Sequence, residues 1–219
     1  MTIRPLNIAW QKMTSVAIER WLRIQTTGYV GPINGEAIHY TPLPYIMVFR
    51  LLRRLELSPA DVFVDIGSGK GRVVCCAARW PLRKVVGIEL NEQLVELSQR
   101  NVRRLRGRQA EVQIVHASAE AFNFDAASVI YLYNPFTERL TTKVLELIDE
   151  SQRRSPRPLR LIYANPVHEV AFRQFDWLEK FDEWADSEYP GFGYPVSFWR
   201  ARGATPRAVA TSSKLVSWG

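Results

Sequence analysis

The sequence contains little cysteine and histidine, and it lacks any long apolar run. Its 219 residues include two cysteines, the neighbours Cys75 and Cys76, and three isolated histidines. Adjacent cysteines rarely pair with each other, so a disulfide framework is excluded, and the histidines lack the ligand spacing of a zinc site. No apolar stretch approaches the roughly 20 residues of a membrane helix. Because the N-terminus also lacks the pattern of a signal peptide, we expect a cytoplasmic protein without membrane contact.

Charge of one sign is in excess. The formal net charge is +7, which favours an anionic partner such as a nucleic acid or an acidic protein surface. Several arginines crowd one short stretch: Arg100, Arg103, Arg104, Arg106 and Arg108. We interpret them first as a solvated helix C-terminus, where cations complement the helix dipole. A nucleic-acid patch remains the alternative, although no aromatic residues are interleaved with these arginines.

Hydrophobic periodicity predicts helices and strands in alternation. An amphipathic helix is expected over 8–25, followed by a long Gly- and Pro-rich loop typical of a lid and by a second helix over 44–55. The expected strands are 62–66, 85–88, 112–115, 128–133, 159–164, 177–184 and 196–202. The expected helices between them are 72–79, 92–105, 138–152 and 167–175.

This alternation predicts an α/β fold. We expect a Rossmann-like, doubly wound, mostly parallel sheet of seven strands, with helices on both faces and an N-terminal helical extension. The expected organisation is an N-terminal helix and lid-like loop over 1–43, a main domain over 44–202 and a loosely attached tail over 203–219.

The strongest motif is the glycine turn in "VFVDIGSGKGRVV", residues 62–74. A phosphate-binding P-loop would need glycine in place of Val64 and Ser or Thr in place of Gly71. A dinucleotide-binding turn would need glycine in place of Arg72. Neither pattern fits, and Lys70 is therefore interpreted as a solvent-side turn residue that does not bind a ligand.

Alternate glycines after an acid resemble another family. The stretch Asp65-Ile66-Gly67-Ser68-Gly69-Lys70-Gly71 resembles motif I of the class I, Rossmann-like S-adenosylmethionine-dependent methyltransferases. Glycines let the backbone approach a ligand closely, and an acid at a strand end can meet the ammonium group of the cofactor. Glu89 matches the second motif of the family, which implies that it accepts the ribose hydroxyls. The resemblance thus implies cofactor contacts at Asp65, Gly67, Ser68, Gly69, Gly71 and Glu89.

Two further strand ends extend the resemblance. Ser118 and Ala119 in "VHASAEAF" align with the turn beside the adenine, although Ser118 also suits a simple turn. In "YLYNPF", Asn134-Pro135-Phe136 resembles the Asn-Pro-Pro-aromatic signature of amine- and amide-modifying members, with one proline instead of two. In those members Asn and the following carbonyls hold the target nitrogen. The implied catalytic residues are Tyr133, Asn134, Pro135 and Phe136, and Asn134 would also contact the cofactor. A plain strand-ending turn is the alternative.

The layout from Tyr40 onward is similar to that of non-SET protein-lysine methyltransferases. Tyr40 and Thr41 lie where such enzymes cover the methionine end of the cofactor. His168, after a second Asn-Pro, is a substrate contact, a general base or a helix-start residue. Tyr29 and Tyr194 are either pocket walls or packing residues.

The expected function is transfer of a methyl group from S-adenosylmethionine to a nitrogen, with a protein side-chain amine as the first candidate acceptor. RNA, DNA or a small molecule is the alternative acceptor, and the net charge motivates the nucleic acids. A catalytically silent module that keeps the cofactor fold is the competing hypothesis of another class.

Overall fold

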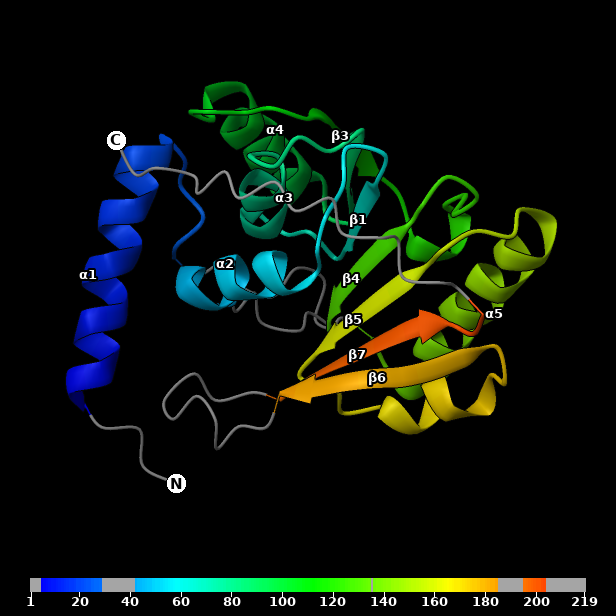
Figure 1. Cartoon of the computed structure of the whole chain (residues 1–219). Helices are drawn as coiled ribbons and strands as arrows, with labels where there is room; N and C mark the ends of the chain where they lie inside the picture. Colours follow the sequence, from blue (N-terminus) through cyan, green and yellow to red (C-terminus); the bar gives the residue numbers. More distant parts are fainter. Residues whose placement is uncertain (1–4, 29–41, 135, 185–194, 204–219) are drawn as a thin grey trace.

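A single central sheet organises the protein (Figure 1). The computed structural model describes residues 5–28, 42–134, 136–184 and 195–203. The strands are β1 Val62–Ile66, β2 Lys84–Glu89, β3 Glu111–His116, β4 Val129–Tyr133, β5 Arg160–Ala164, β6 Leu178–Trp184 and β7 Val196–Ala201. Their order in the seven-stranded sheet is β3-β2-β1-β4-β5-β7-β6, and β7 runs antiparallel to the other six strands. The Rossmann-like fold predicted from the sequence is thereby confirmed.

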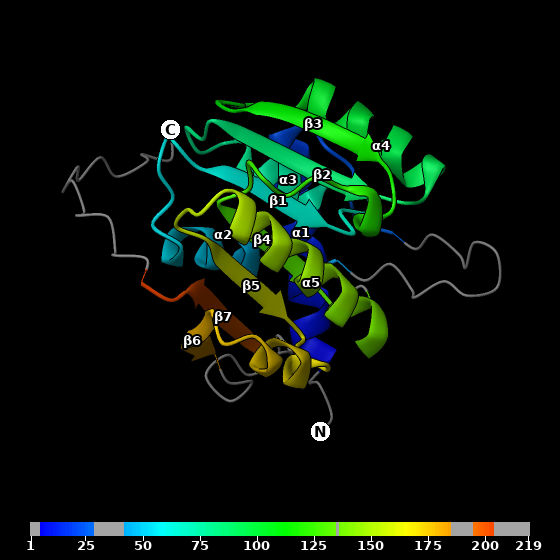
Figure 2. The same ribbon diagram turned by 90° about the vertical axis from the view of Figure 1, so that its right-hand side faces the viewer.

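Helices cover both faces of the sheet, as Figure 2 shows. The α-helices are α1 Pro5–Leu22, α2 Tyr45–Arg54, α3 Arg72–Ala77, α4 Glu92–Arg104 and α5 Glu138–Arg154, and the 3-10 helices are η1 Ala119–Ala121 and η2 Glu169–Gln174. One core lies between the sheet and α2, α3 and α4, and the other lies between the sheet and α5 and η2. Strand β1 is buried throughout because it contributes Phe63 to the first core and Val64 and Ile66 to the second.

Capping residues set the helix boundaries close to those expected. Asn91 begins α4 by accepting a hydrogen bond from the Leu94 amide at 3.0 Å, and Thr137 occupies the same position before α5. The N-terminal helix ends at Leu22, before the expected limit, because Arg23 adopts a left-handed φ of 61°. The helix expected over 167–175 is instead the shorter η2.

A largely buried polar cluster ties the N-terminal helix to α2 and α3. Arg72 donates from Nε to Thr26 Oγ1 at 2.8 Å and from a terminal nitrogen to Thr27 Oγ1 at 3.0 Å, and its guanidinium lies 4.2 Å from the ring centre of Tyr45. Glu19 Oε1 lies 3.4 Å from the same guanidinium and accepts hydrogen bonds from the amides of Thr26 and Thr27. We call Glu19, Thr26, Thr27, Tyr45 and Arg72 the Arg72 network.

The lid-like loop expected from the sequence falls mostly on 29–41, which lies outside the described residues, as does the expected tail from 204 onward. The domain limits predicted from the sequence therefore stay predictions. Within the described part of the chain, no helix is both long and apolar enough to cross a bilayer.

The Arg72 network predicts a stability change for Glu19→Gln. Hydrogen bonds and Arg72 outweigh burial and lower the pKa of Glu19 below its ordinary 4.5, so its contribution is present above that pH and is lost as the pH falls further. We expect the variant to lose about 2 kcal/mol of unfolding free energy at neutral pH, since hydrogen bonds to charged groups contribute about 1.5–3 kcal/mol. Denaturant titration at several pH values measures the difference, which should shrink in acid.

Glu56→Gln is the matched control because Glu56 is exposed. A Glu19→Gln variant as stable as this control at neutral pH would contradict the role assigned to the network.

Candidate active site

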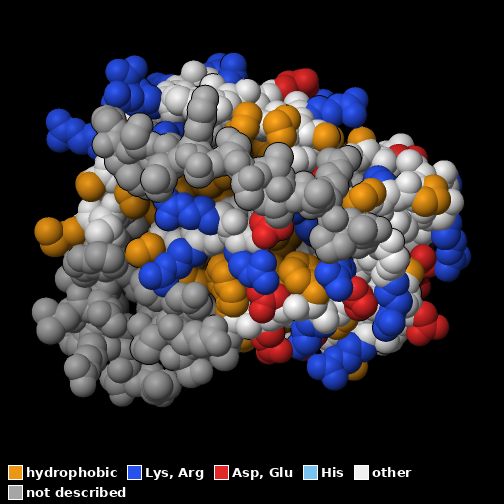
Figure 3. Space-filling model, in the orientation of Figure 1, with side chains coloured by type: hydrophobic (Ala, Val, Ile, Leu, Met, Phe, Trp, Pro, Cys, Tyr) orange, Lys and Arg blue, Asp and Glu red, His pale blue; other side chains and the backbone are white. Residues whose placement is uncertain are grey.

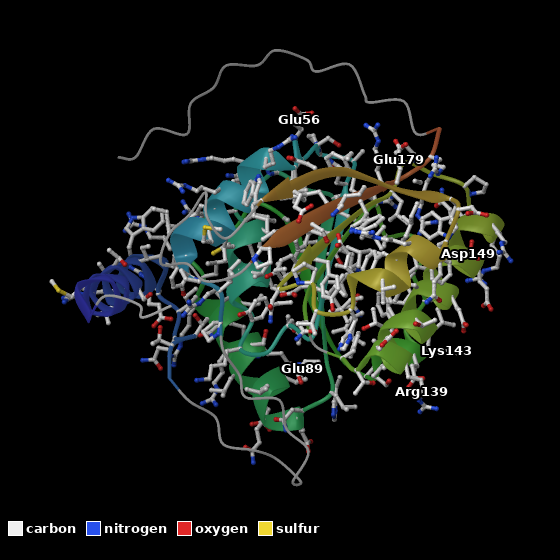
Figure 4. All side chains as sticks on the ribbon, turned by 90° about the horizontal axis from the view of Figure 1, so that it is seen from below. Glu56, Glu89, Arg139, Lys143, Asp149 and Glu179 are labelled. Atoms are coloured by element: carbon white, nitrogen blue, oxygen red, sulfur yellow. The ribbon has the colours of Figure 1, made fainter. Side chains whose placement is uncertain are left out.

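The candidate site lies at the edge of the sheet where the parallel strands end. Strand β1 is flanked by β2 and β4, and the connections after β1 and β4 leave toward opposite faces of the sheet. Such a topological switch point is where open α/β sheets bind their ligands. In Figure 4, Glu89 at the end of β2 and Arg139 at the start of α5 lie at this edge, whereas Glu56 lies on the opposite side of the molecule.

The backbone of the glycine turn folds back onto β2. The amides of Gly67 and Ser68 both donate to the carbonyl oxygen of Ile88 at 2.9 Å. Gly67, Gly69 and Gly71 have φ angles of 73°, 54° and 79°, a region that side chains rarely adopt. The alternate glycines of the motif are therefore required by the shape of the turn.

Packing beneath the turn adds a steric requirement. A Cβ atom on Gly71 would lie 2.3 Å from Ser98 Oγ in α4, and one on Gly87 would lie 2.8 Å from Ser68 Oγ. The Ser68 side chain, which the resemblance assigns to the cofactor, therefore points beneath the turn toward β2. Its hydroxyl is buried and has no hydrogen-bond partner among the described residues.

Glu89 connects the glycine turn to the end of β2. One carboxylate oxygen accepts from the Gly69 amide at 2.8 Å and the other accepts from the Asn91 amide at 2.8 Å. A carboxylate offers about four acceptor positions, so about two remain for a ligand. Two oxygens held apart in this way suit a pair of vicinal hydroxyls, which is the ribose role implied by the resemblance.

Asp65 and Tyr131 form a buried polar pair without partners. The register places Asp65 of β1 beside Tyr131 of β4, and their exposures are 3% and 2%. Burial, with the charge of Glu89, raises the pKa of Asp65 to about 8. Within the described part of the chain, neither the Asp65 carboxyl nor the Tyr131 hydroxyl forms a hydrogen bond.

An orphaned hydroxyl and an orphaned carboxyl at this edge of the sheet fit a ligand that carries both hydrogen-bond donors and acceptors. The zwitterionic methionine end of S-adenosylmethionine is such a ligand. Tyr131 is not among the predicted site residues, although strand alternation puts it on the same face of the sheet as Tyr133.

The expectation for Lys70 is wrong in one respect. Lys70 is only 7% exposed, and its Nζ donates to the carbonyl oxygens of Thr27 and Gly28 at 3.2 and 2.9 Å. Asn101 of α4 reinforces this contact, because its Nδ2 donates to the carbonyl oxygens of Lys70 and Gln25. Lys70 faces the chain segment that follows α1 instead of solvent, and its bonds fasten that segment over the glycine turn.

The two Asn-Pro turns meet through one tyrosine. The Tyr163 hydroxyl of β5 donates to Asn134 Oδ1 at 3.1 Å and accepts from the His168 amide at 3.2 Å. Asn134 and Asn165 both have left-handed φ angles, 36° and 51°, which Asn tolerates better than most residues. His168 occupies the position before η2, as its interpretation as a helix-start residue requires.

The two aromatic residues that were predicted to form the acceptor site, Tyr133 and Phe136, do not lie together. Tyr133 packs against the core beneath α2 and α3, whereas Phe136 packs against the core beneath α5. They therefore lie on different sides of the Asn134 turn.

The residues predicted beside the adenine form a turn. Ser118 accepts a hydrogen bond from the Glu120 amide at 3.2 Å and begins η1, and Ala119 is buried.

Several predicted residues lie outside the described part of the chain. They are Tyr29, Tyr40, Thr41, Pro135 and Tyr194. Their roles remain predictions.

Comparisons with known proteins agree with the fold. The family model for histone methylation protein DOT1 matches residues 34–155. A protein-lysine N-methyltransferase of Saccharolobus islandicus is 25% identical over 122 residues, which cover 55% of this chain and 71% of that protein. A histone H3 lysine-79 N-methyltransferase of Caenorhabditis elegans is 46% identical over 43 residues, 19% of this chain and 4% of that protein.

A solved structure shares the fold. The RNA methyltransferase from Salinibacter ruber, crystallised with S-adenosyl-L-homocysteine, superposes with a TM-score of 0.60 at 22% identity. The alignment covers 76% of this chain and 97% of that one.

Asp65→Asn is expected to stabilise the protein and weaken cofactor binding. The folded state keeps the Asp65 proton up to about pH 8, whereas the unfolded chain releases it above pH 3.8. The unfolding free energy of the wild type therefore falls as the pH rises from 3.8 to about 8, and that of the variant should fall less. The unliganded variant should therefore melt higher than wild type at the top of this window. Its affinity for S-adenosylmethionine should fall about tenfold, since one charge-assisted hydrogen bond is lost.

Thermal unfolding over this pH window and calorimetric titration test both effects. The control is Asp176→Asn, because Asp176 is exposed. A lower melting temperature of unliganded Asp65→Asn would show that the acid is structural.

Tyr131→Phe separates binding from folding. It removes only a hydroxyl that lacks a partner among the described residues, so the melting temperature should stay equal or rise. Affinity for S-adenosylmethionine should fall about fivefold, because one hydrogen bond contributes about 1 kcal/mol. By contrast, Tyr163→Phe loses a hydroxyl with two partners and should lower the melting temperature. Unchanged affinity in Tyr131→Phe would remove Tyr131 from the site.

Proposed function

Since this chain belongs to the family of histone methylation protein DOT1 and is an S-adenosylmethionine-dependent methyltransferase, we propose that it methylates a nitrogen, in the first instance the side-chain amine of a protein. The names of its lysine-modifying relatives support a protein acceptor.

The observation that carries this proposal is the fixed acceptor at the end of β4. Tyr163 holds Asn134 Oδ1 by one hydrogen bond, and an amide oxygen has a second lone pair. A neutral amine keeps N–H donors while its lone pair faces an electrophile, whereas a hydroxyl loses its only proton when it reacts. An anchored acceptor therefore suits an amine better than an alcohol.

The residues at the ends of β1 and β2, together with Tyr131 of β4, fit the cofactor. S-adenosylmethionine supplies an electrophilic methyl group on a sulfonium. Asp65 and Tyr131 would hold its amino-acid end, Glu89 its ribose and the turn beside Ala119 its adenine. The glycine turn positions the carboxylate of Glu89, because the Gly69 amide donates a hydrogen bond to it.

An amine nucleophile must arrive without its extra proton. Tyr133 is half-buried beside the Asn134 turn, and an aromatic wall disfavours the charged ammonium form by desolvation. Asn134 would then orient the lone pair of the neutral amine toward the methyl carbon. No covalent protein intermediate is needed, because the N–C bond forms as the S–C bond breaks and S-adenosylhomocysteine leaves.

Methyl transfer into defined acceptors tests the proposal. Purified protein is incubated with radiolabelled S-adenosylmethionine and either lysine-rich protein, the same protein with its amines blocked by acetylation, RNA or DNA. We expect label only in the unblocked protein. Asn134→Ala should lower kcat/KM for that acceptor about 10²-fold, because misplacement of a reacting group costs that much.

Asn123→Ala is the matched control, since Asn123 is exposed and bonds only within its own turn. Label in RNA or DNA instead would transfer the proposal to the nucleic-acid acceptors that the net charge motivates. Cofactor binding without label in any acceptor would favour the silent module.

A further inference from the structure

Arginines gather at the edge of the sheet opposite the candidate active site. They come from the C-terminal ends of three helices and the turns that follow: Arg20, Arg23, Arg79, Arg103, Arg104, Arg106 and Arg108. All are exposed except the half-buried Arg79. We call this set the arginine surface. In Figure 3, Lys and Arg side chains gather at the upper left, over the region where Figure 1 shows α4 and the end of α1.

Direct contacts make the surface continuous. The Arg106 amide donates to the carbonyl oxygen of Leu22 at 2.9 Å, which brings the turn after α4 against the end of α1. The Arg79 guanidinium lies 4.1 Å from the ring centre of Trp21. A Cβ atom on Gly107 would lie 3.3 Å from Arg79 Nε, so this turn also touches the end of α3.

The charge of the arginine surface is not compensated by nearby acids. Within the described part of the chain, none of these arginines forms an ion pair. Burial lowers the pKa of Arg79, and the neighbouring charge of Arg106 lowers it further. Arg79 Nε is buried and has no hydrogen-bond partner among the described residues. Like charges held together without counter-charges destabilise the protein alone and favour an anionic partner.

We propose that the arginine surface binds the phosphate backbone of a nucleic-acid duplex. Guanidinium groups match phosphate oxygens in pairs, and a duplex carries one charge per about 1.7 Å of its axis. The solvated-helix interpretation of the arginines after 100 does not explain why three helix ends of the same sign converge.

Two other polyanions fit less well. Single strands bind through aromatic stacking, and the aromatic side chain at the surface, Trp21, is covered by Arg79. Protein interfaces have an apolar centre. Of the large apolar side chains that are most exposed in the described residues, Val16 lies on α1 one turn before Arg20 and Met13 one turn before Val16, at the border of the arginine surface, and Leu90, Val167 and Val170 lie on other elements, so none is at its centre. Protein–DNA interfaces are instead polar and positively charged.

The location separates this role from methyl transfer. The turns that carry Arg79 and Arg108 precede the starts of β2 and β3, whereas Asp65 and Glu89 lie at the ends of β1 and β2. The last turn of α4 lies between these two edges, because Asn101 donates to the carbonyl oxygen of Lys70. A duplex bound at the turns would leave the carboxyl ends of the strands open, and the proposal does not depend on the identity of the methyl acceptor.

Fluorescence anisotropy with a labelled, mixed-sequence DNA duplex tests the proposal over a range of salt concentrations. The test variant is Arg103→Ala/Arg104→Ala in the last turn of α4. The control is Arg153→Ala/Arg154→Ala in the last turn of α5, which removes the same charge from arginines already paired with Asp149 and Asp125. We expect the test variant alone to weaken binding and to reduce the slope of log K against log salt by about 2.

Three outcomes would overturn the proposal: no duplex binding by wild type at low salt, equal losses in both variants, or tighter binding of polyglutamate or a single strand than of the duplex. Unchanged affinity of the test variant for S-adenosylmethionine shows that it is folded. A failure here leaves the methylation assays unaffected, because those use a different site.

Discussion

The position of the glycine turn depends on one buried guanidinium. Arg72 is the first residue of α3, directly after the turn, and it is 5% exposed. Its bonds reach Thr26, Thr27 and Glu19, so the start of α3 cannot shift without disturbing the N-terminal helix. A buried charge is tolerated only when it is paired and hydrogen-bonded, which makes the arrangement cooperative. The contacts of Arg72 therefore link the cofactor edge directly to the N-terminal helix.

Much of the fold follows from local pattern. Strand β1 is predicted to the residue, and the other parallel strands to within one residue at each end, because an apolar run between turn residues is a strong signal. The acids at the ends of β1 and β2 and the Asn-Pro turns after β4 and β5 also lie at one edge as predicted, since parallel strands end together.

The remaining features depend on contacts between distant residues. Lys70 meets Thr27 across 43 positions, and no local pattern indicates that the segment after α1 returns over the turn. In the sequence, Tyr131 and Tyr163 cannot be told from ordinary core residues, because both lie in apolar strands. Their neighbours become clear only from the pairing register of β4 with β1 and β5. The convergence of Arg79 and Arg106 likewise depends on tertiary packing that periodicity does not describe.

Because of the packing beneath the glycine turn, the presence of the three glycines is not by itself evidence that a protein binds the cofactor. Gly71 is required by its backbone conformation and by Ser98, and neither constraint involves a ligand. A descendant that had lost its catalytic role would still need these glycines in order to fold. Asp65 and Tyr131 are the opposite case, since each costs stability until something binds. In a set of related sequences, replacement of this pair by apolar residues would mark members that have abandoned the chemistry, even where the glycines persist.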